Sequence, residues 1–140
     1  MTADDPVDEL IDALVRCTFQ VTGLLTRIGA ENDLSLTQLR VFGILRDRRL
    51  RVTDLAAYLG LDKSTMSGLI DRAERRGLLA RAKNQTDGRA VDVLLTPTGQ
   101  DLTRRLYGEA RAALIPDLDR LTPPQRSQLL TLLQPLLTGG

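Results

Sequence analysis

Apolar residues recur every three or four positions over the first thirty residues, which predicts a long amphipathic helix. The helix is expected from about Val7 to Ala30. The positions that carry the pattern are Leu10, Leu14, Val21, Leu24, Leu25 and Ile28. The polar residues 31–33 are expected to end it.

A second helix is predicted from Leu36 to about Arg48. Ser35 and Gln38 stand three residues apart just before and within its first turn. This spacing is a capping box, in which each side chain bonds the other residue's backbone amide. The buried stripe of this helix is expected to contain Leu39, Phe42 and Leu45.

Two further helices with a glycine-containing corner between them follow. Thr53 is expected to cap a short helix over residues 54–59, which Gly60 ends in a left-handed conformation. Asp62 is expected to cap the next helix, over residues 63–76. Such a pair is typical of a helix-turn-helix.

A β-hairpin is predicted directly after this pair. Its strands are expected at residues 78–82 and 90–95, and the polar segment 83–89 between them contains the turn dipeptide Asp87-Gly88. A hairpin in this place is a wing, so the sequence predicts a winged helix-turn-helix.

Two helices are predicted after the hairpin. One begins at Thr96 and reaches about Leu114, where Pro116 is expected to interrupt it. The last runs from Thr122 to about Leu137. The expected fold class is therefore mainly α with a small β-hairpin (α+β).

The composition restricts the chemistry of the chain. There is no histidine and only one cysteine, Cys17, so the commonest general base and the usual zinc ligands are missing. No phosphate-binding glycine motif or nucleophile motif occurs. We therefore expect no enzyme activity, no metal and no cofactor. No apolar run approaches the roughly 18 residues of a membrane span, and the N-terminus is acidic, which indicates a cytoplasmic protein.

The net charge of +1 hides an uneven distribution along the chain. Residues 1–45 carry a net charge of −4, residues 46–89 of +5, and residues 90–140 of zero. A cationic central block suits binding to phosphate, although an unevenly charged solvated surface is an equally good explanation on charge alone.

The helix expected at 63–76 has one apolar and one polar face at 100° per residue. Its inward positions are Met66, Leu69, Ile70 and Ala73. Small hydroxyls on the outward side let a helix approach base edges, and the arginines one or two turns later suit phosphates. The complete set of predicted DNA-contacting residues is Lys63, Ser64, Thr65, Ser67, Gly68, Arg72, Arg75, Arg81, Asp87 and Arg89. The alternative is a solvated face without a partner.

Arg89 is the most informative residue of the hairpin. A guanidinium at a wing tip can enter the minor groove, where the potential of DNA is most negative. Asp87 is expected to hold it through a bidentate ion pair. An exposed turn salt bridge of little consequence is the alternative.

Three segments resemble the MarR family of bacterial transcription regulators. Residues 55–81 read LAAYLGLDKSTMSGLIDRAERRGLLAR, and residues 34–45 read LSLTQLRVFGIL. Residues 87–99 read DGRAVDVLLTPTG, which matches the family's Asp-x-Arg wing followed by Leu-Thr-x-x-Gly. The chain departs from the family at Gly68, where a larger or cationic residue is usual, and this weakens the case for a base contact there.

The resemblance implies a regulator of transcription, with repression the favoured mode, that binds double-stranded DNA at a palindromic operator as a homodimer. The implied organisation is one MarR-type domain over residues 1–140, with a winged helix-turn-helix at 35–98 and dimerisation helices at 7–30 and 100–138. Release from DNA by a small-molecule effector is implied less directly. Its pocket would be lined by Phe19 and Phe42, for which ordinary core packing is the preferred explanation.

The residues near the C-terminus support the homodimer independently. The last helix is apolar nearly all round, and a partner chain or the chain's own core must cover it. The leucines concerned are Leu129, Leu130, Leu132, Leu133, Leu136 and Leu137. A two-fold dimer presents two recognition helices about one DNA turn apart, which requires a near-palindromic site.

Two alternative functions stay open. Cys17 allows a peroxide- or thiol-sensing regulator, although Arg16 is the only neighbouring cation that would lower its pKa. A winged-helix module that binds protein instead of DNA is the second alternative. Salt-dependent retention on duplex DNA would distinguish the second from a DNA-binding regulator.

Overall fold

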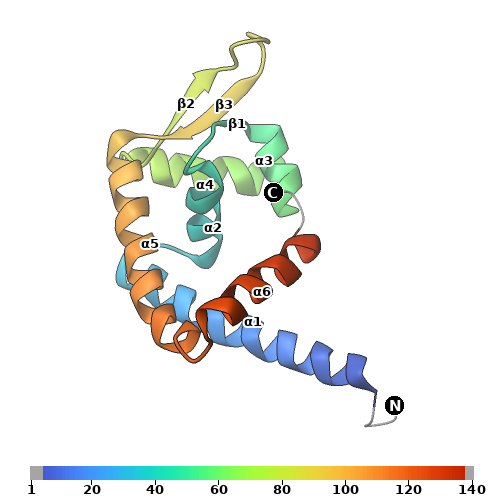
Figure 1. The fold of residues 1–140 in the computed structure, drawn as a ribbon. Coiled ribbons are helices and arrows are strands. Elements are labelled where there is room, and N and C mark those ends of the chain that lie inside the picture. Colours follow the sequence, from blue (N-terminus) through green and yellow to red (C-terminus); the bar gives the residue numbers. More distant parts are fainter. Residues whose placement is uncertain (1–4, 138–140) are drawn as a thin grey trace. The chain divides into compact units, whose positions relative to one another are not determined.

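The structure is a computed structural model in which residues 5–137 are described. It is mainly helical with one small antiparallel sheet, which confirms the predicted fold class (Figure 1). The chain forms two compact units, residues 1–40 and 41–140, and their boundary falls within helix α2 (Leu36–Leu45).

The first unit is dominated by α1 (Pro6–Glu31), close to the helix predicted at 7–30. Asp5 begins it by accepting a hydrogen bond from the amide of Val7 at 2.9 Å, and Pro6 occupies the first turn, where no amide donor is needed. Along this helix only Ile28 and Gly29 are buried.

Helix α2 begins with the predicted capping box. The amide of Ser35 donates to Oε1 of Gln38 at 2.9 Å, and the amide of Gln38 donates to Oγ of Ser35 at 3.1 Å. The predicted end at Arg48 is wrong, because the helix stops at Leu45. The Arg48 guanidinium bonds the carbonyl of Ile44 at 3.2 Å, which satisfies one of the last carbonyls of the helix.

A short strand that the sequence analysis missed explains this early end. Strand β1 (Leu50–Arg51) pairs with β3 (Val91–Leu95), and two residues are too few to show an alternating pattern. Strand pairing therefore ends α2 early. It also makes the predicted Thr53 cap wrong, because α3 (Val52–Leu59) begins directly after Arg51 and without a side-chain cap.

Helices α3 and α4 (Lys63–Arg75) form the predicted helix-turn-helix. Gly60 ends α3 with φ 68°, a left-handed conformation that favours glycine. Asp62 then caps α4, as predicted: its carboxylate accepts a hydrogen bond from the amide of Thr65 at 2.7 Å. The corner between the two helices is thus set by one glycine and one aspartate.

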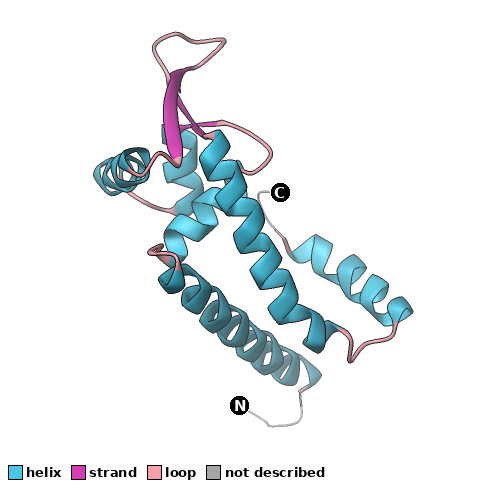
Figure 2. Cartoon of the chain, turned by 90° about the vertical axis from the view of Figure 1, so that its left-hand side faces the viewer, coloured by secondary structure: helices cyan, strands magenta, loops and turns pink. Residues whose placement is uncertain are grey.

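Strand β2 (Leu79–Lys83) and β3 form the predicted hairpin, which with β1 makes an antiparallel sheet of order β1-β3-β2. In Figure 2 the strands are short beside the helices, and the loop of the hairpin extends beyond the sheet. The hairpin lies directly after α4 in the chain and is therefore a wing.

The predicted interruption at Pro116 is wrong. Helix α5 (Pro97–Leu118) continues through it, because a proline in the last turn removes a single amide donor while the next turn still closes, with the amide of Asp119 on the carbonyl of Ile115 at 2.8 Å. The last helix, α6 (Pro123–Leu133), ends before the predicted Leu137 and passes into a short 3-10 turn. The predicted range 100–138 ends one residue beyond the described residues.

The core of the 41–140 unit contains side chains from α2, α3, α4, α5 and the sheet. The seven large side chains that are most completely buried are Val41, Phe42, Leu45, Leu55, Met66, Ile70 and Val93. Phe42 and Leu45 are buried as predicted, whereas Leu39 of the first unit is half-buried.

The start of α5 is joined closely to the segment that follows α4. The hydroxyl of Thr96 donates to the carbonyl of Gly77 at 2.6 Å and accepts from the amide of Gly99 at 3.0 Å. The amide of Thr96 donates to the carbonyl of Leu78 at 3.1 Å. A Cβ atom on Gly99 would overlap this same carbonyl oxygen, so the backbones approach as closely as only glycine permits.

We expect Gly99→Ala to lower the free energy of unfolding by about 1–3 kcal/mol or more, because a rigid backbone carbonyl occupies the space of the new methyl group. Gly108→Ala in the same helix is the matched control: nothing lies within 4 Å of its added Cβ, and alanine should stabilise the helix by about 1 kcal/mol. Urea unfolding followed by circular dichroism measures both. Equal effects of the two substitutions would contradict the close approach.

Candidate nucleic-acid interface

Helix α4 presents the two faces that its sequence predicts. Its buried residues are Met66, Leu69, Ile70 and Ala73. The exposed positions include those predicted to contact DNA: Lys63, Ser64, Thr65, Ser67, Arg72 and Arg75. Gly68 is half-buried, and a Cβ added there would meet only the tip of the Arg72 side chain, at 3.4 Å. Packing within the chain therefore does not require a glycine at this position.

The N-terminus of α4 is held by Asp62. The hydrogen bond from the Thr65 amide lowers the pKa of this carboxyl, and bonds from the Thr65 hydroxyl and from Ser64 add to the effect. The carboxylate thus stays charged next to the positive end of the helix dipole. The cap fixes where α4 begins and so where Ser64 and Thr65 stand.

Arg81, also predicted to contact DNA, is engaged within the chain. From β2 its guanidinium forms ion pairs with Asp71, at 2.9 Å, and with Glu74, both on α4. It also lies 3.5 Å from the hydroxyl of Ser67. Two carboxylates neutralise this arginine, so its placement favours a role in joining the hairpin to α4.

The loop of the wing is organised by Asn84. Its Oδ1 accepts hydrogen bonds from the amide of Thr86 at 3.0 Å, from the hydroxyl of Thr86 at 2.8 Å and from the amide of Asp87 at 3.0 Å. The amide of Ala90 donates to the carbonyl of Asp87 at 3.0 Å and closes the turn around Gly88. The loop is therefore internally bonded despite its polar sequence.

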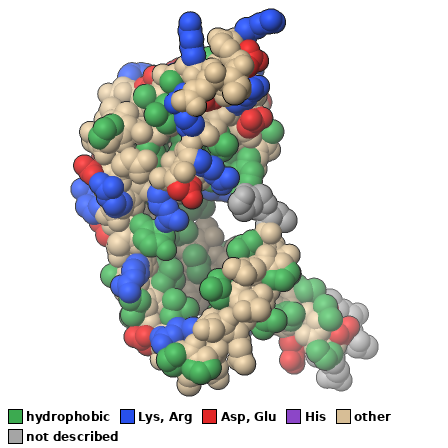
Figure 3. All heavy atoms as spheres, turned by 45° about the horizontal axis from the view of Figure 1, so that its top comes forward, with side chains coloured by type: hydrophobic (Ala, Val, Ile, Leu, Met, Phe, Trp, Pro, Cys, Tyr) green, Lys and Arg blue, Asp and Glu red, His purple; other side chains and the backbone are tan. Residues whose placement is uncertain are grey.

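The predicted bidentate pair between Asp87 and Arg89 is wrong. The carboxylate of Asp87 instead accepts a hydrogen bond from the backbone amide of Arg89 at 3.0 Å, since a backbone amide two residues away is its nearest donor. Arg89 is exposed and takes no part in any ion pair among residues 5–137. Figure 3 shows Lys and Arg side chains projecting at the tip of the hairpin.

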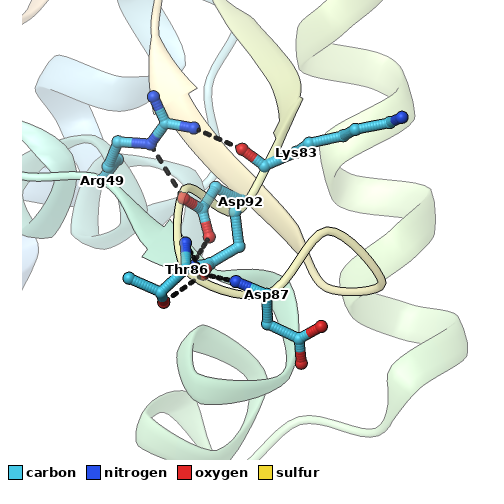
Figure 4. A network of polar contacts seen from close by, with 6 residues as sticks. Arg49, Lys83, Thr86, Asp87 and Asp92 are labelled. Atoms are coloured by element: carbon cyan, nitrogen blue, oxygen red, sulfur yellow. Dashed lines mark hydrogen bonds and ion pairs between the residues drawn. The ribbon is translucent and has the colours of Figure 1, made fainter.

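A buried carboxylate at the base of the wing was missed by the sequence analysis. The side chain of Asp92 on β3 is only 5% exposed and forms an ion pair with Nε of Arg49 at 2.8 Å (Figure 4). The amide nitrogen of Asn84 donates to its other oxygen at 2.9 Å. This bond and, after it, Arg49 lower the pKa of Asp92 against the opposing effect of burial. The only signal in the sequence was an aspartate within an apolar strand.

The remaining predicted residues lie outside this region. Cys17 is exposed on α1, and the neighbouring Arg16 pairs with Asp12 at 3.8 Å. Phe19 is 71% exposed, so core packing is the wrong explanation for it within one chain, whereas Phe42 is buried as core. Neither lines the groove of about 450 Å³ between α5 and α6. The groove is lined by Tyr107, Ala110, Arg111, Leu114, Ile115, Leu118, Asp119 and Arg126.

Within residues 5–137 no helix combines the length and apolar character needed to cross a membrane.

A model of the MarR family matches residues 32–90, which include the helix-turn-helix and most of the wing. Over these residues the chain is identified with the MarR family. The transcriptional regulator YfiV of Bacillus subtilis is 33% identical to it over 95 residues, 67% of this chain and 59% of YfiV. The chain thus spans about three fifths of this relative's length.

Two further comparisons cover nearly the whole chain. The homoprotocatechuate degradative operon repressor of Escherichia coli is 27% identical over 134 residues, which are 95% of this chain and 90% of the repressor. The solved structure of BpsR from Bordetella bronchiseptica is 25% identical with a TM-score of 0.72, and covers 100% of this chain and 99% of BpsR. YfiV is a transcriptional regulator and the Escherichia coli relative is a repressor, which agrees with the expectation that the chain is not an enzyme.

We expect Asp62→Ala to lower the melting temperature and Asp62→Asn to preserve it near neutral pH, because asparagine caps a helix as well as aspartate does. The lowered pKa means that the carboxylate stabilises the fold above its ordinary pKa of 3.8 and loses this effect as the pH falls through the folded-state value. The advantage of the wild type over Asp62→Ala should therefore shrink as the pH falls below 3.8. Thermal unfolding at neutral pH and about pH 3 measures it, and a gap of equal size at both would contradict the cap.

Proposed function

We propose that this MarR-family chain is a sequence-specific transcription regulator that binds double-stranded DNA through α4 and the wing. One observation carries the proposal. The exposed face of α4, with its hydroxyls and arginines, and the exposed Arg89 of the wing belong to one compact unit, in a segment with a net charge of +5. The regulated DNA binding of BpsR supports it.

In this proposal α4 lies in the major groove. Ser64, Thr65 and Ser67 carry short hydroxyl side chains that bond base edges or phosphates while the helix stays close to the DNA. Arg72 and Arg75 lie two turns later and contact the flanking phosphates. Asp62 sets the start of the helix and thereby the depth at which these side chains approach.

The wing supplies the second contact. Arg89 enters the minor groove, where a guanidinium without a carboxylate partner meets the most negative potential of the duplex. The bond between Asp87 and the amide of Arg89 orders the backbone of the tip, while the guanidinium forms no ion pair among residues 5–137. Asp87 thus acts through the position of Arg89, and Arg81 through the attachment of β2 to α4.

The functional form is proposed to be a homodimer on a palindromic operator. Helix α6 has no buried residue, and its leucines Leu130 and Leu132 are 58% and 70% exposed. Helix α1 exposes a second apolar stripe that includes Leu10, Ile11 and Leu14. Apolar faces of this extent need cover, and a second copy of the chain supplies the same surface in a two-fold arrangement.

Repression and release by a small molecule complete the proposal. The Escherichia coli relative is a repressor, and the DNA binding of BpsR is regulated by 6-hydroxynicotinic acid. Both support a regulator that blocks transcription until an effector binds. A cytoplasmic location follows from this role, since the operator lies there.

We expect Arg89→Ala to weaken binding to the specific duplex by about tenfold or more. It should also lower the slope of log affinity against log salt by about one, because one cationic side chain near the phosphates is lost. Arg120→Ala, which removes an exposed arginine of the α5–α6 connection, should leave both unchanged. Fluorescence anisotropy at several salt concentrations measures both variants. Wild-type affinity in Arg89→Ala would rule out the wing contact.

We expect Leu132→Glu to convert the dimer into a monomer and to weaken binding to a palindromic duplex far more than to a half-site, because a carboxylate would be buried in an apolar interface. Ser127→Glu places the same charge on a polar position of α6 and should keep the dimer. Light scattering after size-exclusion chromatography measures the mass of each. A monomeric wild type at micromolar concentration would contradict the dimer.

A further inference from the structure

We infer that the cluster of Arg49, Asp92 and Asn84 holds the wing in position for DNA binding, and we define these three residues as the wing anchor. The inference rests on the proposed DNA-binding function. The three residues come from three places in the chain: the segment before β1, the central strand β3, and the first residue of the wing loop. They act through Arg89 and are therefore positioning residues.

The centre of the wing anchor is a carboxylate with both oxygens engaged. Nε of Arg49 donates to Oδ2 of Asp92 at 2.8 Å, and Nδ2 of Asn84 donates to Oδ1 at 2.9 Å. The same guanidinium donates through Nη2 to the carbonyl of Lys83, at 3.0 Å. Figure 4 shows the Lys83 side chain extending away from the cluster. Arg49 thus bridges both strands of the hairpin at the point where the loop begins.

Asn84 connects the buried carboxylate of Asp92 to the backbone of the wing loop. Because its amide nitrogen faces the negative charge of Asp92, its Oδ1 must face the loop. There the oxygen accepts the amide of Asp87, whose carboxylate in turn accepts the amide of Arg89. Hydrogen bonds therefore run without a gap from the buried carboxylate to the backbone of Arg89. A tip that is ordered before binding loses less conformational entropy on the DNA.

The direction in which one substitution changes the affinity for DNA distinguishes this positioning role from a purely electrostatic effect. Asp92 is an acid at the base of the cationic wing, so its neutralisation alone should strengthen binding to phosphate. Asp92→Asn keeps only one of the two acceptor oxygens, so Arg49 and Asn84 cannot both keep their hydrogen bonds, and Arg49 loses its ion pair. The wing anchor therefore predicts weaker binding from the loss of a negative charge.

The experiment compares Asp92→Asn with Asp47→Asn, which neutralises an exposed acid of the same compact unit. We expect a loss of at least fivefold in affinity for the specific duplex in Asp92→Asn, and unchanged or slightly tighter binding in Asp47→Asn. Adding Arg89→Ala to Asp92→Asn should lower the affinity clearly less than adding it to the wild type, because Arg89 is already misplaced in Asp92→Asn. Heteronuclear NOE values of amides 84–90 should fall in Asp92→Asn, while those of α4 stay unchanged.

Asn84→Ala gives an independent test if Asp92→Asn fails to fold, because it cuts the link to the loop and leaves the ion pair with Arg49 in place. It should show the same loss of affinity and the same mobile wing. Wild-type or tighter binding in both variants, with Arg89→Ala still weakened, would overturn the wing anchor and leave the proposed function standing. A wild type without any specific duplex affinity would overturn both.

Discussion

Burial of one face of α4 is the constraint on which the rest of this structure depends. Met66, Leu69, Ile70 and Ala73 repeat with the period of a helix and can be buried together only if the opposite face points outward. The side chains of that opposite face have no packing role in the core, so a run of small polar residues there costs the fold little. Core packing and the proposed contact with DNA thus share one helix without competing for the same positions.

A count of the basic residues overstates how many of them are available to bind a nucleic acid. Several arginines of the cationic segment are engaged within the chain: Arg49 pairs with Asp92, Arg81 with Asp71 and Glu74, and Arg46 lies over the ring of Tyr107 at 4.8 Å. These contacts join the hairpin to the segment before β1 and to α4, and the segment after α2 to α5. The cations left for a nucleic acid are fewer, and they stand at the tip of the wing and along α4. Such a surface depends more on where these few cations stand than on its total positive charge.

Local chemistry was predictable from the sequence wherever it depends on residues close together in the chain. The capping box of Ser35, the left-handed Gly60, the Asp62 cap and both faces of α4 all follow from spacing alone. Long-range pairing decided the failures. Strand β1 exists because β3 lies beside it, which moved the start of α3 away from Thr53, and Asp92 is buried because Arg49 arrives from a distant segment. The role of Asp87 was misjudged because a backbone amide competes well with a guanidinium at short range.

The junction at Thr96 connects the start of α5 closely to the segment that follows α4. The Thr96 hydroxyl donates a hydrogen bond to the carbonyl of Gly77, and at Gly99 the two backbones meet without a side chain between them. Because backbone meets backbone here without an intervening side chain, the start of the 22-residue α5 and the exit of α4 are expected to move together. A change in the tilt of α5 would then also change the direction of α4 and, in the proposed homodimer, the distance between the two α4 helices.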